Sequence, residues 1–206
     1  MPASILMITE VFTQNGSTEE AIAQWSSLRA ETSSDSVLFR STVDNSLLEL
    51  TALTDIAQLD KEREFFDRLF TGLAPYVQSD FRRQVLGFVE APKTTDAAIP
   101  STPYIQLRHI EVPPAVYTEY RQWRELTIFD VVRRAEEVEV FLAYHSLLST
   151  EPGVMFVSGF EVDPDRYAEV FSTDEYQEIV RQAGSKFIAT GERGLYTKIY
   201  QRVEHS

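Results

Sequence analysis

The chain has 206 residues, of which 43% are hydrophobic and 25% are charged, as is typical of a soluble globular protein with one large domain or two small ones. Its formal net charge of −13 argues against nucleic acid and anionic membranes as partners, because their phosphate groups would be repelled. Cysteine is absent, which excludes disulfides, thiolate nucleophiles and cysteine-based metal sites.

The N-terminal stretch "MPASILMITEVF" is apolar and rich in strand formers. It lacks the basic region and the long apolar run of a signal peptide. No segment approaches the roughly 20 apolar residues that a membrane-spanning helix needs. We therefore expect a cytoplasmic protein without a membrane partner.

The first half of the chain predicts the element order β-α-β-β-α-β. Ser17 and Glu20 form a capping box ahead of one helix, and Asp55 can cap the other. Asp44-Asn45 suits a hairpin turn between the two middle strands. The strands are expected in the segments "ILMITEVF", "VLFRSTV", "SLLELTAL" and "FRRQVLGFVEA".

The same order returns after the linker-like segment "APKTTDAAIPSTP". Pro114 is placed near the first turn of a helix, and Pro152-Gly153 marks a turn between strands. The second helix of this half is interrupted near Ser172-Thr173-Asp174. Its strands are expected in "YIQLRHIEV", "EVFLAYHSLLS", "VMFVSGFEV" and "GLYTKIYQRV".

Each half is therefore a ferredoxin-like unit, whose four-stranded sheet carries helices on one face only. The other face must be covered, and the second copy is the nearest cover. We predict an α+β fold of two tandem ferredoxin-like repeats, packed sheet to sheet as an intramolecular α/β barrel. The repeats span 1–91 and 104–206, with a linker at 92–103. A barrel closed within one chain need not dimerise, so either a monomer or a homodimer is expected.

This arrangement resembles the dimeric α/β-barrel superfamily with the usual dimer fused into one chain. "YIQLRHIEVPP" is similar to the opening of NIPSNAP-type domains, and "STDEYQEIV" resembles the S-x-E-Y-like segment in the second helix of many members. Antibiotic-biosynthesis monooxygenases, small-ring polyketide cyclases and heme-degrading monooxygenases share this fold. The resemblance implies an active site between the sheet and its helices or inside the barrel.

The chain departs from these relatives at the residues that carry their chemistry. Quinone-forming members have an Asn and a Trp, four apart, on the third strand. The corresponding positions here are Glu49 and Leu53 in the first copy, and Val157 and Glu161 in the second. Heme-degrading members have a His on the second helix, where this chain has Val180. No catalytic set carries over residue by residue, and a fold alone does not supply a function.

The candidate catalytic residues lie in the second half. His109 and His145 fall in predicted strands, and His205 belongs to the C-terminal tail. A histidine can act as a general base near neutral pH or ligate heme iron, and it can also be a structural, hydrogen-bonded strand residue. Arg108 can hold a carboxylate, an enolate or a developing oxyanion. We assign His145, His109 and Arg108 as the catalytic candidates.

The strand period leaves the orientation of the pair at 108–109 open. Alternation places His109 and Glu111 on one face and Gln106 and Arg108 on the other. If the helices cover the more apolar set, Gln106 and Arg108 line the cavity inside the barrel. Alignment with the heme-degrading members instead turns His109 and Glu111 inward.

Four further residues are assigned to substrate binding. Glu49 is expected to face the cavity inside the barrel, because its neighbours Leu48 and Leu50 look helix-facing. By the same logic Glu161 opens toward the cavity or its rim. The full set is Glu49, Glu111, Tyr144 and Glu161.

No metal site is expected. The carboxylates of the "DPD" at 163–165 are interpreted as helix caps, and 191–194 as a loop. The sequence hypothesis is an enzyme that tailors a hydrophobic aromatic or polyketide-like small molecule, as a monooxygenase or a cyclase, without a cofactor. The alternatives are a heme enzyme with an axial histidine and a non-catalytic ligand-binding or interaction module.

Overall fold

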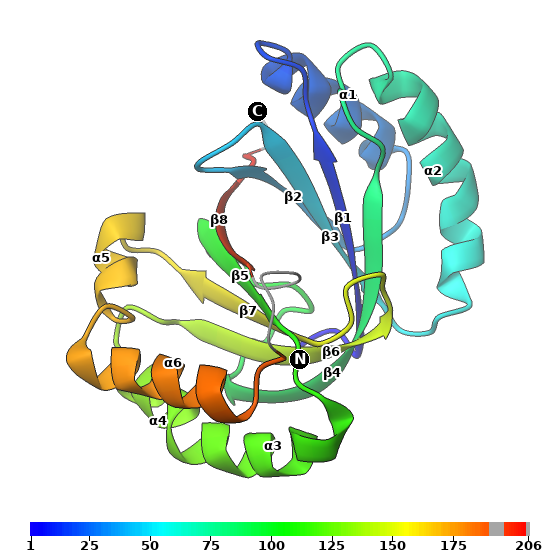
Figure 1. The fold of residues 1–206 in the computed structure, drawn as a ribbon. Helices are drawn as coiled ribbons and strands as arrows, with labels where there is room; N and C mark the ends of the chain where they lie inside the picture. The colour runs from blue at the N-terminus through cyan, green and yellow to red at the C-terminus, as the bar shows by residue number, and fades with distance from the viewer. Residues whose placement is uncertain (190–195, 205–206) are drawn as a thin grey trace.

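The computed structural model describes residues 1–189 and 196–204. His205 and the whole loop predicted at 191–194 therefore lie outside the described residues. The strands form one closed antiparallel barrel in the order β1-β3-β2-β8-β5-β7-β6-β4 (Figure 1).

The elements of the first half appear in the predicted order. The strands alternate apolar and polar residues or run apolar, as half-buried and fully buried strands do. They are β1 (Ile5–Phe12), α1 (Thr18–Ala30), β2 (Ser36–Ser41), β3 (Ser46–Leu53), α2 (Gln58–Leu73) and β4 (Arg82–Lys93).

The second half repeats this order, with each of its two helical segments divided. A 3₁₀ turn precedes the first helix, which breaks at Thr127, and the second is interrupted at 170–173, as the sequence predicts. The elements are β5 (Tyr104–Ile110), η1 (Pro114–Val116), α3 (Tyr117–Leu126), α4 (Ile128–Arg134), β6 (Val140–Leu148), β7 (Val154–Phe160), α5 (Pro164–Glu169), α6 (Asp174–Lys186) and β8 (Tyr196–Arg202).

Two seams close the barrel. Within each half the fourth strand pairs with the first, the first with the third and the third with the second, as in a ferredoxin-like sheet. The halves then join through β2 with β8 and through β4 with β6. The prediction of two tandem repeats forming an intramolecular α/β barrel is confirmed.

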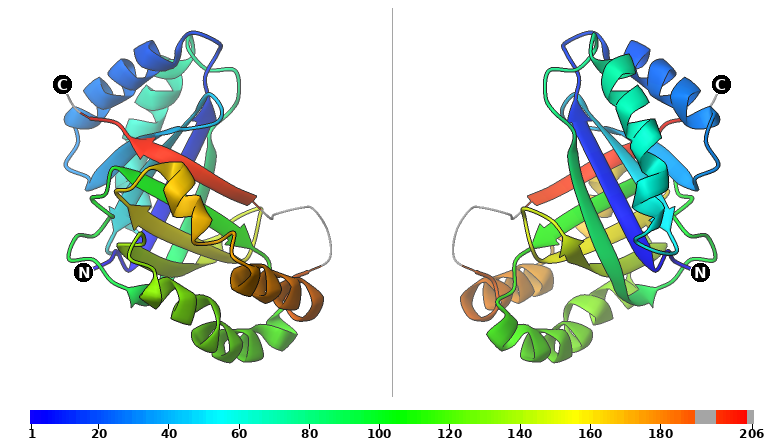
Figure 2. Two further views of the ribbon diagram at one scale, coloured as in Figure 1. Left: turned by 90° about the vertical axis from the view of Figure 1, so that its left-hand side faces the viewer. Right: turned by 90° about the vertical axis from the view of Figure 1, so that its right-hand side faces the viewer.

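Helices cover the barrel from two opposite sides. The pair α1 and α2 lies over the first-half strands, while α3, α4 and α6 lie over the second-half strands (Figure 2). Three main apolar layers result: one inside the barrel and one under each group of helices. None of the helices in the described part of the chain combines the length and apolarity that crossing a membrane requires.

Local signals were confirmed in part. Asp163 caps α5 by accepting a hydrogen bond from the amide of Asp165, as its place ahead of Pro164 predicts. Ser17 takes the N-cap position of α1, but its side chain makes no capping hydrogen bond. Asp55 accepts from the amide of Ala57, in the turn ahead of α2 rather than at its cap.

Gly153 ends the turn between β6 and β7 with a φ of +148°, which side-chain-bearing residues rarely adopt. A Cβ at this position would lie 2.3 Å from the backbone oxygen of Ile110 and 3.0 Å from Nε2 of His109. Glycine is therefore required here, and His109 packs directly against it.

Candidate functional site

A cavity of about 320 Å³ lies between the second-half sheet and its helices. Strands β5, β6, β7 and β8 supply one wall, and α4, α6 and the turn before α6 supply the other. Most lining side chains are apolar, as in sites for small organic molecules. The lining residues are Gln106, Arg108, His109, Ile110, Ile128, Phe141, Phe156, Phe171, Tyr176, Ile179, Val180, Ala183, Ile188, Tyr196 and Thr197.

Arg108 provides the cationic group of this cavity. Its Nε donates to Oγ1 of Thr197 at 3.2 Å, and its Nη1 donates to the hydroxyl of Tyr176. The guanidinium also lies 5.3 Å from the ring centroid of Phe171. No carboxylate of the described residues forms an ion pair with it, so this positive charge is available to an anionic ligand.

Tyr176 begins α6 on the cavity side and is 3% exposed. Burial raises the pKa of its hydroxyl, although Arg108 acts in the opposite direction. The phenol therefore stays protonated at neutral pH and fixes the direction of the guanidinium.

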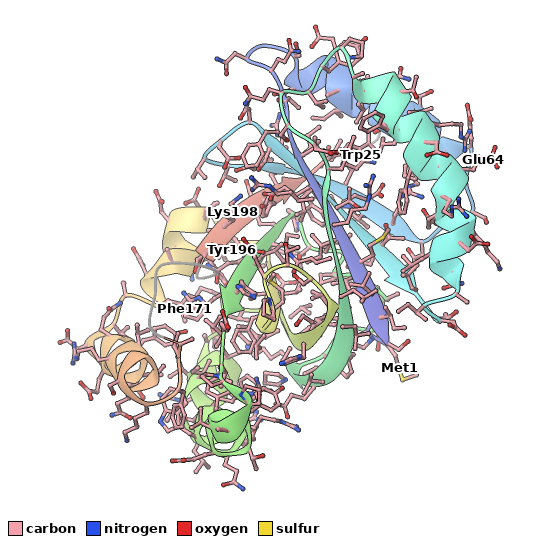
Figure 3. The ribbon with its side chains drawn as sticks, turned by 45° about the vertical axis from the view of Figure 1, so that its right-hand side comes forward. Met1, Trp25, Glu64, Phe171, Tyr196 and Lys198 are labelled. Atoms are coloured by element: carbon pink, nitrogen blue, oxygen red, sulfur yellow. The ribbon has the colours of Figure 1, made fainter. Side chains whose placement is uncertain are left out.

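His109 lies at one end of the cavity and is 2% exposed. Its ring stacks on that of Tyr196, with centroids 5.4 Å apart and planes 23° apart. Burial raises the pKa of Tyr196 to about 12. Figure 3 shows Tyr196 and Lys198 on β8, between the helices of the two halves, and Phe171 beside the helices of the second half.

The other catalytic candidate, His145, does not line this cavity. Its ring packs edge-on against Tyr117 at 5.2 Å, and its Nδ1 lies 3.2 Å from the backbone oxygen of Ser146. Strand β7 separates its strand from β5.

Three predicted substrate-binding residues also lie outside the cavity. Tyr144 points into the apolar barrel interior, and its hydroxyl donates to the backbone oxygen of Ala3 at 3.3 Å. Glu161 is exposed just beyond β7, and Glu111 is half-buried beyond β5. Neither carboxylate is brought into contact with Arg108.

The prediction that Glu49 faces the barrel interior is wrong. Glu49 points toward α1 and is 1% exposed; its Oε2 accepts from Nε1 of Trp25 and from Nε of Arg29, both at 2.9 Å. Arg29 also pairs with Glu62 at 2.9 Å. Burial opposes the charge of Arg29, but the two carboxylates outweigh it and raise its pKa. The carboxylate of Glu49 is thus bound by Trp25 and Arg29 within the protein.

The prediction grouped the residues of this strand correctly, but it exchanged the face toward the helices with the face toward the barrel interior. Leu48 and Leu50 pack inside the barrel, together with Ile105 and Leu107. The inner face is therefore the more apolar one, because eight strands turn their side chains into a space closed to water. Of the two orientations left open for β5, His109 does belong to the inward-facing set, and Gln106 and Arg108 face the helices.

The open end of the barrel forms a second hollow of about 610 Å³, lined among others by Glu10, Lys198 and Tyr200. Here Lys198 pairs with Glu10 at 2.7 Å, and the hydroxyl of Tyr200 donates to the same carboxylate at 2.9 Å. The buried charges satisfy one another, and none of the predicted site residues lines this hollow.

Heme does not fit the residues of the cavity. The position that the resemblance assigns to a heme-ligating histidine is Val180, which lies in the cavity wall and has no ligating atom. Nε2 of His109 is buried and packs against Gly153, which leaves no room for a macrocycle on that side. A carboxylate or histidine cluster suited to a metal ion is also absent from residues 1–189 and 196–204.

Sequence reasoning missed Tyr176 and Phe171 as cavity residues, and it placed Gln106 beside a cavity in only one of two alternatives and did not assign it to the site. Both aromatics fall at helical spacing among apolar residues, which is also the pattern of ordinary core residues. The break at 172–174 was the available signal, because it ends one helix and starts another at the place where Tyr176 reaches Arg108.

No protein-family model matches the sequence, and no curated protein matches it. Solved structures match in fold. An anthrone oxidase-like protein is 14% identical with a TM-score of 0.73, covering 97% of this chain and 91% of its own. A monooxygenase-like protein from Listeria innocua is 10% identical with a TM-score of 0.59, covering 99% and 96%.

The heme-degrading enzyme LmHde from Listeria monocytogenes is 8% identical with a TM-score of 0.57, covering 96% of this chain and 98% of its own. At such identities the likeness concerns the fold alone. The chain has the dimeric α/β-barrel fold, completed within one polypeptide.

Proposed function

We propose that the protein is a monooxygenase- or cyclase-type enzyme acting on a hydrophobic aromatic or polyketide-like small molecule held in the second-half cavity. The observation that carries the proposal is Arg108: a guanidinium without a carboxylate partner among the described residues, set in an otherwise apolar cavity. Arg108 is half-buried, and a charge partly withdrawn from water is normally paired, so this guanidinium indicates a ligand with an anionic oxygen.

The proposed chemistry uses two neighbouring residues of β5 that line the cavity, His109 and Arg108. His109 accepts a proton from an acidic hydroxyl or an activated methylene group of the substrate. Arg108 stabilises the resulting phenolate or enolate, and Tyr176 and Thr197 hold the guanidinium in place. Such an electron-rich anion is the species that reacts with dioxygen or closes a ring. This role requires a ring nitrogen of His109 to reach the substrate, and Nε2 is enclosed against Gly153, so the His109→Gln variant below tests it directly.

Anthrone is a suitable first substrate, since an anthrone oxidase-like protein shares the fold and the molecule is planar, apolar and weakly acidic. Dioxygen uptake and quinone absorbance would be measured with the wild type and with Arg108→Met, His109→Gln and His145→Gln. We expect kcat/KM to fall by about 10²–10³-fold for Arg108→Met and by about 10²-fold for His109→Gln.

His145→Gln is the matched control and should stay within about twofold of the wild type, because His145 lies outside the cavity. Equal activity of the wild type and Arg108→Met would contradict the proposal. Tight binding of anthrone without turnover would instead identify a ligand-binding module.

A further inference from the structure

We infer that the ligand of this cavity carries two oxygen groups: an acidic one at Arg108 and a carbonyl or hydroxyl group at Gln106. The inference rests on the proposed function, because it names the substrate class of the same cavity. It depends on a different residue, Gln106, which the proposed chemistry does not use.

Gln106 is buried, yet its amide has no protein partner. The residue is 6% exposed and lines the cavity. No side-chain hydrogen bond of Gln106 occurs within residues 1–189 and 196–204. Its cross-strand neighbours do not supply one: Ile199 is apolar, and the hydroxyl of Ser158 donates to the backbone oxygen of Val140 at 3.2 Å.

A primary amide that is buried without hydrogen bonds costs free energy, which is why such groups almost always have partners. The amide atoms of Gln106 are open to the cavity, so their hydrogen bonds go to water there or to the ligand that replaces it. The amide offers both a donor and an acceptor, so a carbonyl or a hydroxyl oxygen satisfies it.

The position of Gln106 fixes the shape of the ligand. Gln106 and Arg108 are two residues apart on β5 and share the helix-facing side, which separates their Cα atoms by roughly 6.6 Å. The helix wall opposite is mostly apolar, with Ile179 and Ala183 on α6, and the hydroxyl of Tyr176 on the same helix already accepts from Arg108. A planar ring system lying along β5 with an oxygen at each end meets both side chains.

The same reasoning predicts an unusual effect on stability. Leucine at position 106 has a similar volume and removes the unpartnered amide, so Gln106→Leu should raise the Tm of the ligand-free protein. If Gln106 had a structural role instead, the Gln106→Leu substitution would lower the Tm.

The test uses two fluorescent probes, 2-naphthoate and 6-hydroxy-2-naphthoate, titrated into the full-length protein. Gln106→Leu should weaken binding of the hydroxylated probe by about fivefold and change that of 2-naphthoate by less than about twofold. Arg108→Met should weaken both by about tenfold or more. Gln201→Leu, on β8 outside the cavity, is the control and should change neither.

The outcomes separate the two proposals. If Gln106→Leu affects both probes equally, or neither, the inference about Gln106 is overturned while the anion site at Arg108 stands. If neither probe binds the wild type, the cavity does not hold aromatic anions, and the proposed function falls with the inference.

Discussion

At the scale of single residues, the buried charges divide into those that are paired within the protein and those that are open to a ligand. Arg124 on α3 is fully buried, and its Nε donates to Oε1 of Glu90 at 3.1 Å. Its guanidinium also lies 5.1 Å from the ring centroid of Phe129. Unlike Arg108, this arginine has its counter-charge in place, so we assign it to the fold.

The Arg124–Glu90 pair makes stability depend on pH. Burial alone would raise the pKa of Glu90, but Arg124 and Arg121 outweigh it and lower the pKa below the ordinary value of 4.5. A depressed folded-state pKa stabilises the fold above about pH 4.5, and this contribution is lost as the pH falls through the folded-state pKa.

Glu90→Gln should therefore lower the free energy of unfolding by about 2 kcal/mol at pH 7, less than for a fully buried pair because Glu90 is 30% exposed. The gap to the wild type should narrow below pH 4. Urea unfolding at pH 7 and at pH 3.5 measures both values. Glu125→Gln removes an exposed pair with Arg133 and should cost less than about 0.5 kcal/mol. A gap that is the same at both pH values would contradict this account.

At the scale of elements, the break between α5 and α6 shapes the site. Thr173 caps α6, because its hydroxyl accepts from the amide of Tyr176 at 3.2 Å. The cap fixes the first turn of the helix that brings the Tyr176 hydroxyl to Arg108. The sequence predicted the interruption, and the structure shows that it allows a new helix to start where Tyr176 reaches Arg108.

Thr173→Ala should cost about 1 kcal/mol of stability, as the loss of an N-cap usually does. It should also weaken ligand binding, because α6 forms a cavity wall. Ser17→Ala is the matched control: Ser17 occupies an N-cap position without a capping hydrogen bond and should change stability by less than about 0.5 kcal/mol. Chemical denaturation compares the two. Equal losses would show that the cap bond at Thr173 contributes nothing.

At the scale of the whole molecule, the two repeats share one architecture but not one interior. In the first repeat the space under the helices is filled by Trp25, Phe65 and Leu69, with Glu49 and Arg29 beside them. In the second repeat the corresponding layer leaves a cavity around Arg108. This asymmetry is the reason that the proposed site is placed in the second half.

The closed barrel also makes each repeat depend on the other. Its interior joins side chains of both, among them Leu50 of the first repeat and Leu107 and Tyr200 of the second, all at most 1% exposed. Residues 1–103 and 104–206 expressed separately should each bind a hydrophobic dye or self-associate, because a separate half exposes this face. Co-expressed halves should elute as a 1:1 complex, measured by size-exclusion chromatography with light scattering. Halves that stay monomeric and do not bind the dye would contradict the prediction.

The sequence by itself determined the order of the elements, the tandem repeat and the barrel. These follow from local signals that the chain states directly: the strand and helix periods, the proline and glycine turns, the cap at Asp163 and the interruption before α6. It also singled out Arg108 and His109, since an Arg-His pair in the opening strand of one repeat has no counterpart in the other.

Only the tertiary structure decided which way the strands face. Alternation tells which residues share a face, and the polarity of the faces normally tells which one is buried. In a barrel covered by helices both faces of a strand are buried, as the wholly buried β7 shows. The polarity of Glu49 and Gln106 therefore does not tell which way their side chains point. A carboxylate paired with Arg29 and an amide open to a cavity look alike in a sequence; the difference lies in partners that other parts of the chain provide.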